Sequence, residues 1–130
     1  GSGSGWQAAI LSVLVGEGKI FSIDRHVELV KFAKENLNRL GIHNVDVILG
    51  DGSLGRPDEA PFDRIIITAA CKKVPSALFE QLSLDGLLIA PIGEFLQSLV
   101  VFKKTSQGII EIKNQIGYAF VPLIEGFEDS

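Results

Sequence analysis

The sequence predicts an α/β fold, a doubly wound and mostly parallel sheet that ends in an antiparallel C-terminal hairpin. Helical and strand-like segments alternate between residues 6 and 92, the order that is typical of parallel sheets covered by helices. The loops that follow the expected strands contain Gly and Asp. Near the C-terminus, apolar and aromatic residues instead occupy even positions between 110 and 120, which indicates antiparallel strands at the sheet edge.

In the first half of the chain, helical and strand patterns follow each other closely. The first expected helix begins at Trp6 and ends at the residues 16–18, Gly-Glu-Gly. A short strand at residues 19–23 leads into Asp24. The second helix ends at Gly41, and its apolar stripe comprises Val30, Ala33, Leu37 and Leu40.

The second half contains more strands than helices. The β-branched run at residues 64–68 is of the kind that is buried on both faces of a parallel sheet. The other expected elements are strands at 45–49 and 87–92, a short helix at 75–82, a turn at 84–86 and hairpin strands at 98–103 and 110–121.

Composition limits the class of protein. A chain of 130 residues with 46% hydrophobic and 22% charged residues fits one soluble domain, here residues 1–130. Its longest apolar run is too short to span a bilayer, and a net charge of −4 opposes binding to nucleic acid, so we expect neither a membrane nor a nucleic-acid partner. A single cysteine, Cys71, indicates a reducing, cytoplasmic location. Two isolated histidines make no metal site.

The first five residues, Gly-Ser-Gly-Ser-Gly, open directly into the first expected helix. Such a loop lets backbone N–H groups approach an anionic or nucleoside ligand closely. The same letters also occur in expression linkers, so both interpretations stay open on these residues alone.

Two aspartates follow expected strands and are candidates for ligand contact. Asp24 lies about 20 residues after the glycine loop, the spacing at which a carboxylate accepts the hydroxyls of a ribose, but it could equally cap the following helix. Asp51 lies between two glycines and could be a ligand or only a turn residue. The loop has Trp6 where a dinucleotide fingerprint needs its third glycine, which favours S-adenosylmethionine over a nicotinamide cofactor.

Several blocks of sequence together resemble the protein-L-isoaspartate O-methyltransferase family, a group of class I S-adenosylmethionine-dependent methyltransferases with a Rossmann-like fold. The resemblance covers nearly the whole chain and makes the glycine loop native, because Trp6 continues the family motif without a break. It rests on residues 1–9, 50–53, 60–66, 91–93 and 120–123.

The resemblance implies a role for each group of candidate residues. Gly1, Ser2, Gly3 and Gly5 would surround the methionine and ribose of S-adenosylmethionine, and Asp24 would bind the ribose hydroxyls, with Arg25 beside it. Asp51 and Gly52 would contact the adenine. On the substrate side, the residues implied are Thr68, Ala69, Ala70, Val121, Pro122 and Leu123.

The reaction implied is methyl transfer to the α-carboxylate of L-isoaspartyl residues in damaged proteins, with S-adenosylhomocysteine as the product. A carboxylate is already ionised at neutral pH, so no catalytic base is expected. Two departures stand against the resemblance: residues 71–74 differ from the family's substrate-side loop, and the family has further chain, including the first sheet strand, before the glycine loop.

Two other functions stay open, a methyltransferase for another substrate and an inactive, truncated nucleoside-binding fragment. A missing first strand would expose an apolar sheet edge, so we also expect the 130-residue chain to self-associate or to be poorly soluble.

Overall fold

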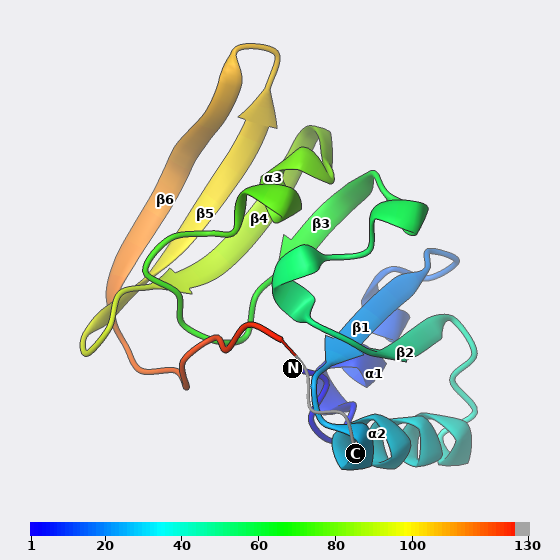
Figure 1. Cartoon of the computed structure of the whole chain (residues 1–130). Coiled ribbons are helices and arrows are strands. Elements are labelled where there is room, and N and C mark those ends of the chain that lie inside the picture. Colours follow the sequence, from blue (N-terminus) through cyan, green and yellow to red (C-terminus); the bar gives the residue numbers. More distant parts are fainter. Residues whose placement is uncertain (127–130) are drawn as a thin grey trace. The chain divides into compact units, whose positions relative to one another are not determined.

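The computed structural model describes residues 1–126 and divides into two compact units (Figure 1). The first unit contains Gly1–Gly52 and the described residues that follow Ile124, and the second contains Ser53–Ile124. Each unit has its own sheet and its own buried core.

The first unit alternates helices with parallel strands. Helix α1 (Trp6–Leu14) leads to strand β1 (Ile20–Asp24), which is followed by helix α2 (Val27–Arg39) and strand β2 (Val45–Leu49). Strands β1 and β2 are parallel, with Ile20 opposite Val45 and Asp24 opposite Leu49. Their carboxyl ends therefore lie at the same edge, and this part of the predicted element order is confirmed.

The two helices differ in how their apolar residues are used. In α2, three of the four residues of the predicted stripe pack with Val47 of β2 to form the core of this unit, whereas Leu40 is exposed. In α1 the buried residues are the small Ala8 and Ser12. Large apolar residues that recur at helical spacing in α1 are exposed, among them Trp6 (72%) and Val13 (78%). Helical spacing located α1 correctly but not its buried face.

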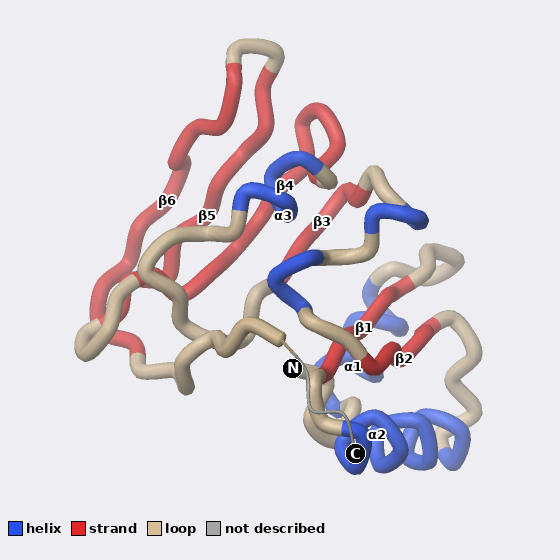
Figure 2. Tube along the Cα trace, viewed as in Figure 1, coloured by secondary structure: helices blue, strands red, loops and turns tan. Residues whose placement is uncertain are grey.

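The second unit contains a four-stranded sheet in the order β3-β4-β5-β6 (Figure 2). Strand β3 is parallel to β4, and the other two pairs are antiparallel, so the predicted antiparallel C-terminal hairpin is confirmed. The elements of this part of the chain are the short helices η1 (Gly52–Leu54), η2 (Pro57–Glu59) and α3 (Ser76–Glu80), and the strands β3 (Phe62–Ile66), β4 (Leu82–Ile92), β5 (Gln97–Thr105) and β6 (Gly108–Tyr118).

Strand β3 departs from the prediction in position and in burial. It begins two residues before the expected run and ends at Ile66, so Thr68 lies outside it. β3 is an edge strand of its sheet and is not buried on both faces: Ile66 is 42% exposed, whereas Ile67, just after the strand, is buried in the core of the unit. The β-branched pattern identified a strand but could not place it within the sheet.

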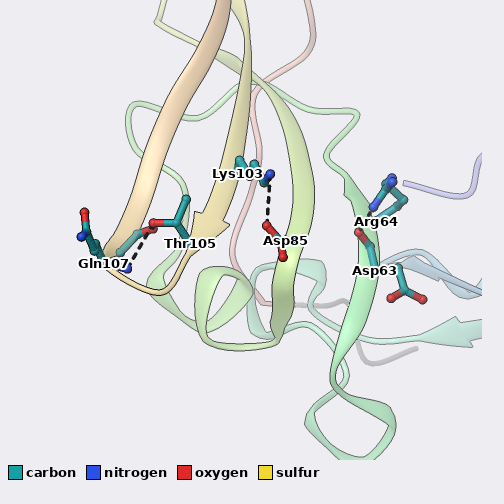
Figure 3. Close-up of polar contacts among 7 residues, drawn as sticks. Asp63, Arg64, Asp85, Lys103, Thr105 and Gln107 are labelled. Carbon is teal, nitrogen blue, oxygen red and sulfur yellow. Dashed lines mark hydrogen bonds and ion pairs between the residues drawn. The ribbon is translucent and has the colours of Figure 1, made fainter.

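The turn expected at residues 84–86 lies inside β4. The register with β3 shifts there: Leu82 lies opposite Phe62 and Leu87 lies opposite Arg64. Residues 83–86 of β4 therefore bulge out of the pairing with β3. Asp85 has the positive φ of 61° that a turn requires. Its Oδ1 pairs with Nζ of Lys103 on β5 at 3.1 Å (Figure 3).

Candidate functional site

The glycine loop is a tight turn that leads into α1. Gly3 and Gly5 have positive φ values of 54° and 82°, which residues with a side chain adopt only at a cost. The N–H of Gly5 donates to the carbonyl of Ser2 at 2.9 Å, and the carbonyl of Gly5 accepts from the N–H of Ala9 in α1. Glycine at these two positions is therefore required by the backbone conformation.

Gly5 is also a point of close packing. A Cβ atom at this position would lie 3.3 Å from the Cβ and the carbonyl oxygen of Ala33, which is fully buried in α2. The third glycine of the loop thus lets the start of α1 approach α2, a packing role that any larger side chain would disturb.

Three contacts fasten the loop to the carboxyl end of β1. The Oγ atoms of Ser2 and Ser22 are 2.7 Å apart, and the amino group of Gly1 donates to the carbonyl of Ile23. The backbone N–H of Gly3 donates to Oδ2 of Asp24 at 3.0 Å. The structure therefore brings together two features that the sequence separates by about 20 residues.

Asp24 binds two backbone N–H groups and is not the N-cap of α2, which is His26. It is 4% exposed, and its Oδ1 accepts from the N–H of His26 at 3.0 Å, just before α2 begins. Its Oδ2 accepts from the loop. An ionised carboxylate offers about four acceptor positions, so these two bonds leave acceptor capacity for the hydroxyls of a ribose. Asp24 therefore links the glycine loop to the chain that enters α2.

Asp51 and Arg25 meet at one residue of the C-terminal segment. Oδ2 of Asp51 accepts from the N–H of Gly126 at 2.6 Å, and Nε of Arg25 donates to the carbonyl of the same residue at 3.1 Å. The N–H of Gly50 donates to the carbonyl of Asp24, which ties the end of β2 to the end of β1. All eight residues expected to bind the cofactor, Gly52 at the start of η1 included, lie in the first unit.

The expected substrate-side residues lie in the second unit, where Ala70 and the segment 121–123 are joined. The N–H of Ala70 donates to the carbonyl of Val121, and the N–H of Leu123 donates to the carbonyl of Ala70, each at 2.7 Å. These bonds form a parallel bridge between Ala70 and Pro122. Val121 and Pro122 are exposed, whereas Leu123 packs against the core. Thr68 and Ala69 are half-buried in the chain leading to Ala70.

Cys71 has the surroundings of a structural residue. It is buried in the core cluster of the second unit, and burial raises the pKa of its thiol, which disfavours the reactive thiolate. Next to it, Lys72 pairs with Glu94 at 2.7 Å, and the hydrogen bond and charge of Glu94 raise the pKa of this lysine. Residues 1–126 contain no group of three or more His, Cys, Asp or Glu that could hold a metal ion.

Three polar residues with a clear role were missed by the sequence analysis. Nδ2 of Asn36 in α2 donates to the carbonyl of Ser4, and Ser22 holds Ser2, so both support the glycine loop. Gln97 binds the backbone of Phe120 just before the segment 121–123. Side chains that act on backbone groups leave no periodic signal, so only the tertiary structure reveals them.

A glycine loop bonded to the carboxylate at the end of the next strand, in an α/β fold with both parallel and antiparallel strands, defines the class: a Rossmann-like methyltransferase fold. Solved structures support this assignment. A protein-L-isoaspartate O-methyltransferase superposes with a TM-score of 0.87 and 34% identity over 94% of this chain and 39% of its own. A structure from Plasmodium falciparum, described as a protein-L-isoaspartate O-methyltransferase in complex with S-adenosyl-L-homocysteine, gives 0.77 and 29% over 95% of this chain and 63% of its own.

Sequence comparison identifies the family. The family model described as protein-L-isoaspartate(D-aspartate) O-methyltransferase matches residues 1–128. A protein-L-isoaspartate O-methyltransferase from Pyrococcus horikoshii is 51% identical over 95% of this chain and 57% of its own length. The corresponding protein from Pyrococcus abyssi is 52% identical over 95% of this chain and 58% of its own. The chain therefore belongs to the protein-L-isoaspartate O-methyltransferase family, and it spans a little over half the length of these relatives.

Proposed function

We propose that the protein transfers a methyl group from S-adenosylmethionine to the α-carboxylate of L-isoaspartyl residues in damaged proteins. The proposal rests on membership of the family together with one contact, the 3.0 Å hydrogen bond from Gly3 to Asp24. That contact holds a flexible loop against a buried carboxylate that retains acceptor capacity, which is what recognition of a nucleoside requires.

The cofactor would supply an electrophilic methyl group on a sulfonium. In this proposal Gly1, Ser2, Gly3 and Gly5 surround its methionine and ribose, and Asp24 accepts the ribose hydroxyls, with Arg25 at the rim. Asp51 and the backbone of Gly52 bind the adenine. Glycines have no side chain that would keep a ligand away from the backbone of this loop, so a ligand can approach it closely.

The substrate side needs no acid–base machinery. The α-carboxylate of the substrate is ionised at neutral pH, and the residues proposed to border it, Thr68, Ala69 and Ala70, are small or uncharged. Val121, Pro122 and Leu123 would hold the peptide. Rate enhancement would come from orienting the carboxylate and excluding water rather than from proton transfer.

The decisive experiment compares two peptides of the same sequence, one with L-isoaspartate and one with ordinary aspartate at the same position. The intact protein and labelled S-adenosylmethionine should methylate only the isoaspartyl peptide. Equal labelling of both peptides, or of neither while a small molecule is methylated, would favour the alternative of a methyltransferase for another substrate.

A second candidate is nucleoside binding without turnover. It is favoured by the division of the chain: all eight proposed cofactor residues belong to the first compact unit, and the proposed substrate residues belong to the second. Calorimetry with S-adenosylhomocysteine, run beside the peptide assay, separates the two functions. Binding without methyl transfer would identify this second candidate.

We also propose that the chain self-associates through a sheet edge and works in the cytoplasm. The edge in question is the one that the family's first sheet strand would cover. In the sheets of residues 1–126, β1 pairs only with β2 and β3 only with β4, and such edges pair readily with another chain. The buried thiol of Cys71 suits a reducing compartment.

No helix among residues 1–126 is long and apolar enough to cross a membrane. Sedimentation velocity that gives a monomer at all concentrations would contradict self-association.

A further inference from the structure

The segment that follows β6 continues the chain without belonging to the sheet. Strand β6 ends at Tyr118, and residues 119–123 make only an isolated bridge. Two groups hold this segment from the inside: Ala70, through the carbonyl of Val121 and the N–H of Leu123, and the side chain of Gln97, through Phe120.

Gln97 binds Phe120 as a neighbouring strand would. Its Oε1 accepts from the N–H of Phe120 at 2.6 Å, and its Nε2 donates to the carbonyl of the same residue at 3.1 Å. One side-chain amide thus satisfies both backbone groups of one residue, as the opposite residue does in a hydrogen-bonded pair of an antiparallel sheet. These bonds are shielded from water, because Gln97 is 3% exposed.

The position of Gln97 is itself fixed by a tight turn before β5. Nε2 also donates to the carbonyl of Glu94 at 3.3 Å. Gly93 has a φ of 131°, and a Cβ there would lie 2.8 Å from the carbonyl oxygen of Leu96, so the turn admits only glycine. The N–H of Gly93 is bound to the carbonyl of Cys71, next to Ala70.

The two anchors leave one side of the segment facing outward. Val121 is 71% exposed, although the carbonyl of this residue is bound to Ala70. Because its backbone is held on both sides, the exposed side chain of Val121 offers a rigid contact surface. Without the Phe120 anchor, the segment would have to become ordered when a ligand binds, and this ordering would cost conformational entropy.

We propose that Gln97 is a positioning residue for the peptide substrate: it holds Phe120 so that Val121 and Pro122 present a preformed surface to the peptide. This inference rests on the proposed function, because it takes the peptide as the ligand of segment 121–123. Gln97 touches neither the cofactor nor the reacting carboxylate, so its loss weakens peptide binding and spares the chemical step.

The test is steady-state kinetics of the intact protein with an isoaspartyl peptide, using Gln97→Leu and the isosteric Gln97→Glu. We expect KM for the peptide to rise about 10-fold in the leucine variant, with kcat and KM for S-adenosylmethionine changed less than about 2-fold. The glutamate variant keeps the bond from the N–H of Phe120 but turns an acceptor oxygen toward the carbonyls of Phe120 and Glu94, so its KM should rise at least as much as that of the leucine variant. This variant also keeps the volume of the side chain if the leucine variant does not fold.

Gln81 provides a matched control within the same unit. It too is buried, at 8% exposure, and its amide binds backbone on both sides, accepting from the N–H of Arg56 and donating to the carbonyl of Leu54. Gln81→Leu removes the same chemistry elsewhere and should leave KM for the peptide unchanged.

A positioning role also predicts a local change that a general loss of stability would not produce. Hydrogen exchange at the amide of Phe120 should accelerate in Gln97→Leu and not in Gln81→Leu. If the two leucine variants show the same KM for the peptide, or if kcat alone falls, the positioning role is wrong and the proposed function stands. A wild-type protein that methylates no isoaspartyl peptide contradicts the proposed function and removes the substrate role of Gln97 with it.

Discussion

Oδ2 of Asp51 accepts a 2.6 Å hydrogen bond from the backbone N–H of Gly126, a residue 75 positions further along the chain. Arg25 donates to the carbonyl of the same glycine. Asp51, proposed to bind the adenine, and Arg25, proposed to lie beside Asp24 at the rim, therefore bind one residue of the C-terminal segment. The amino group of an adenine is the same kind of donor as the N–H of Gly126, so Asp51 has the chemistry to recognise it.

Asp51→Ala should therefore remove discrimination at the adenine amino group. S-adenosylhomocysteine and its deaminated analogue, S-inosylhomocysteine, differ in that group, and wild type should bind the adenosyl compound about 10-fold more tightly. Calorimetry on the four combinations of protein and ligand measures the coupling directly. A preference that survives in Asp51→Ala would place the adenine elsewhere.

Asp24→Asn should weaken S-adenosylhomocysteine binding by about 10-fold or more. The substitution keeps the size of the side chain but turns one acceptor oxygen toward a donor group, so a backbone N–H of Gly3 or His26 loses its partner and the ribose loses an anionic acceptor. Asp46→Asn is the matched control, because Asp46 lies exposed on the neighbouring strand β2 and pairs with Lys19. Equal affinities in the two variants would remove Asp24 from the binding site.

Gly5→Ala should destabilise the protein more than Gly16→Ala. Both glycines have positive φ, so each substitution should cost roughly 1–2 kcal/mol of backbone strain. Only at Gly5 would the added Cβ also press on Ala33, since nothing lies within 4 Å of a Cβ at Gly16. Urea denaturation that gives equal losses in the free energy of unfolding would show that the α1 to α2 approach relaxes freely.

Lys104→Met should lower the free energy of unfolding by about 2 kcal/mol. Nζ of Lys104 donates to three carbonyls around the end of α3, those of Phe79, Glu80 and Leu82, at 2.7–3.1 Å, and charge-assisted bonds of this kind are worth more than neutral ones. The neighbouring Lys103 makes only the partly exposed ion pair with Asp85 that Figure 3 shows. Lys103→Met should therefore cost less than about 1 kcal/mol in the same urea titration. Similar losses in the two variants would contradict a structural role for the carbonyl cluster.

The element order and the glycine turn before α1 could be predicted from the sequence because they depend on local patterns. Helical spacing located α1 and α2, alternation located the β5 and β6 hairpin, and the glycine spacing with Asp24 indicated a nucleoside ligand. Each of these signals comes from residues that are close in sequence or at a fixed spacing. The physical requirement, either burial of one face or a positive φ, applies to those same residues, so it is visible in their identity.

Whatever depends on long-range partners was decided by the tertiary structure. The apolar spacing of α1 could not reveal that Trp6 is exposed, and the β-branched run could not reveal that β3 is an edge strand, because burial depends on which elements lie opposite. Asp24 could have been a helix cap or a ribose ligand. The structure gives the N-cap position of α2 to His26 and bonds Asp24 to the N–H groups of Gly3 and His26. The sequence did not indicate the role of Gln97, because its amide binds the backbone of Phe120, 23 residues away. Nearly all residues carry the same backbone groups, so the sequence does not mark which of them a side chain will bind.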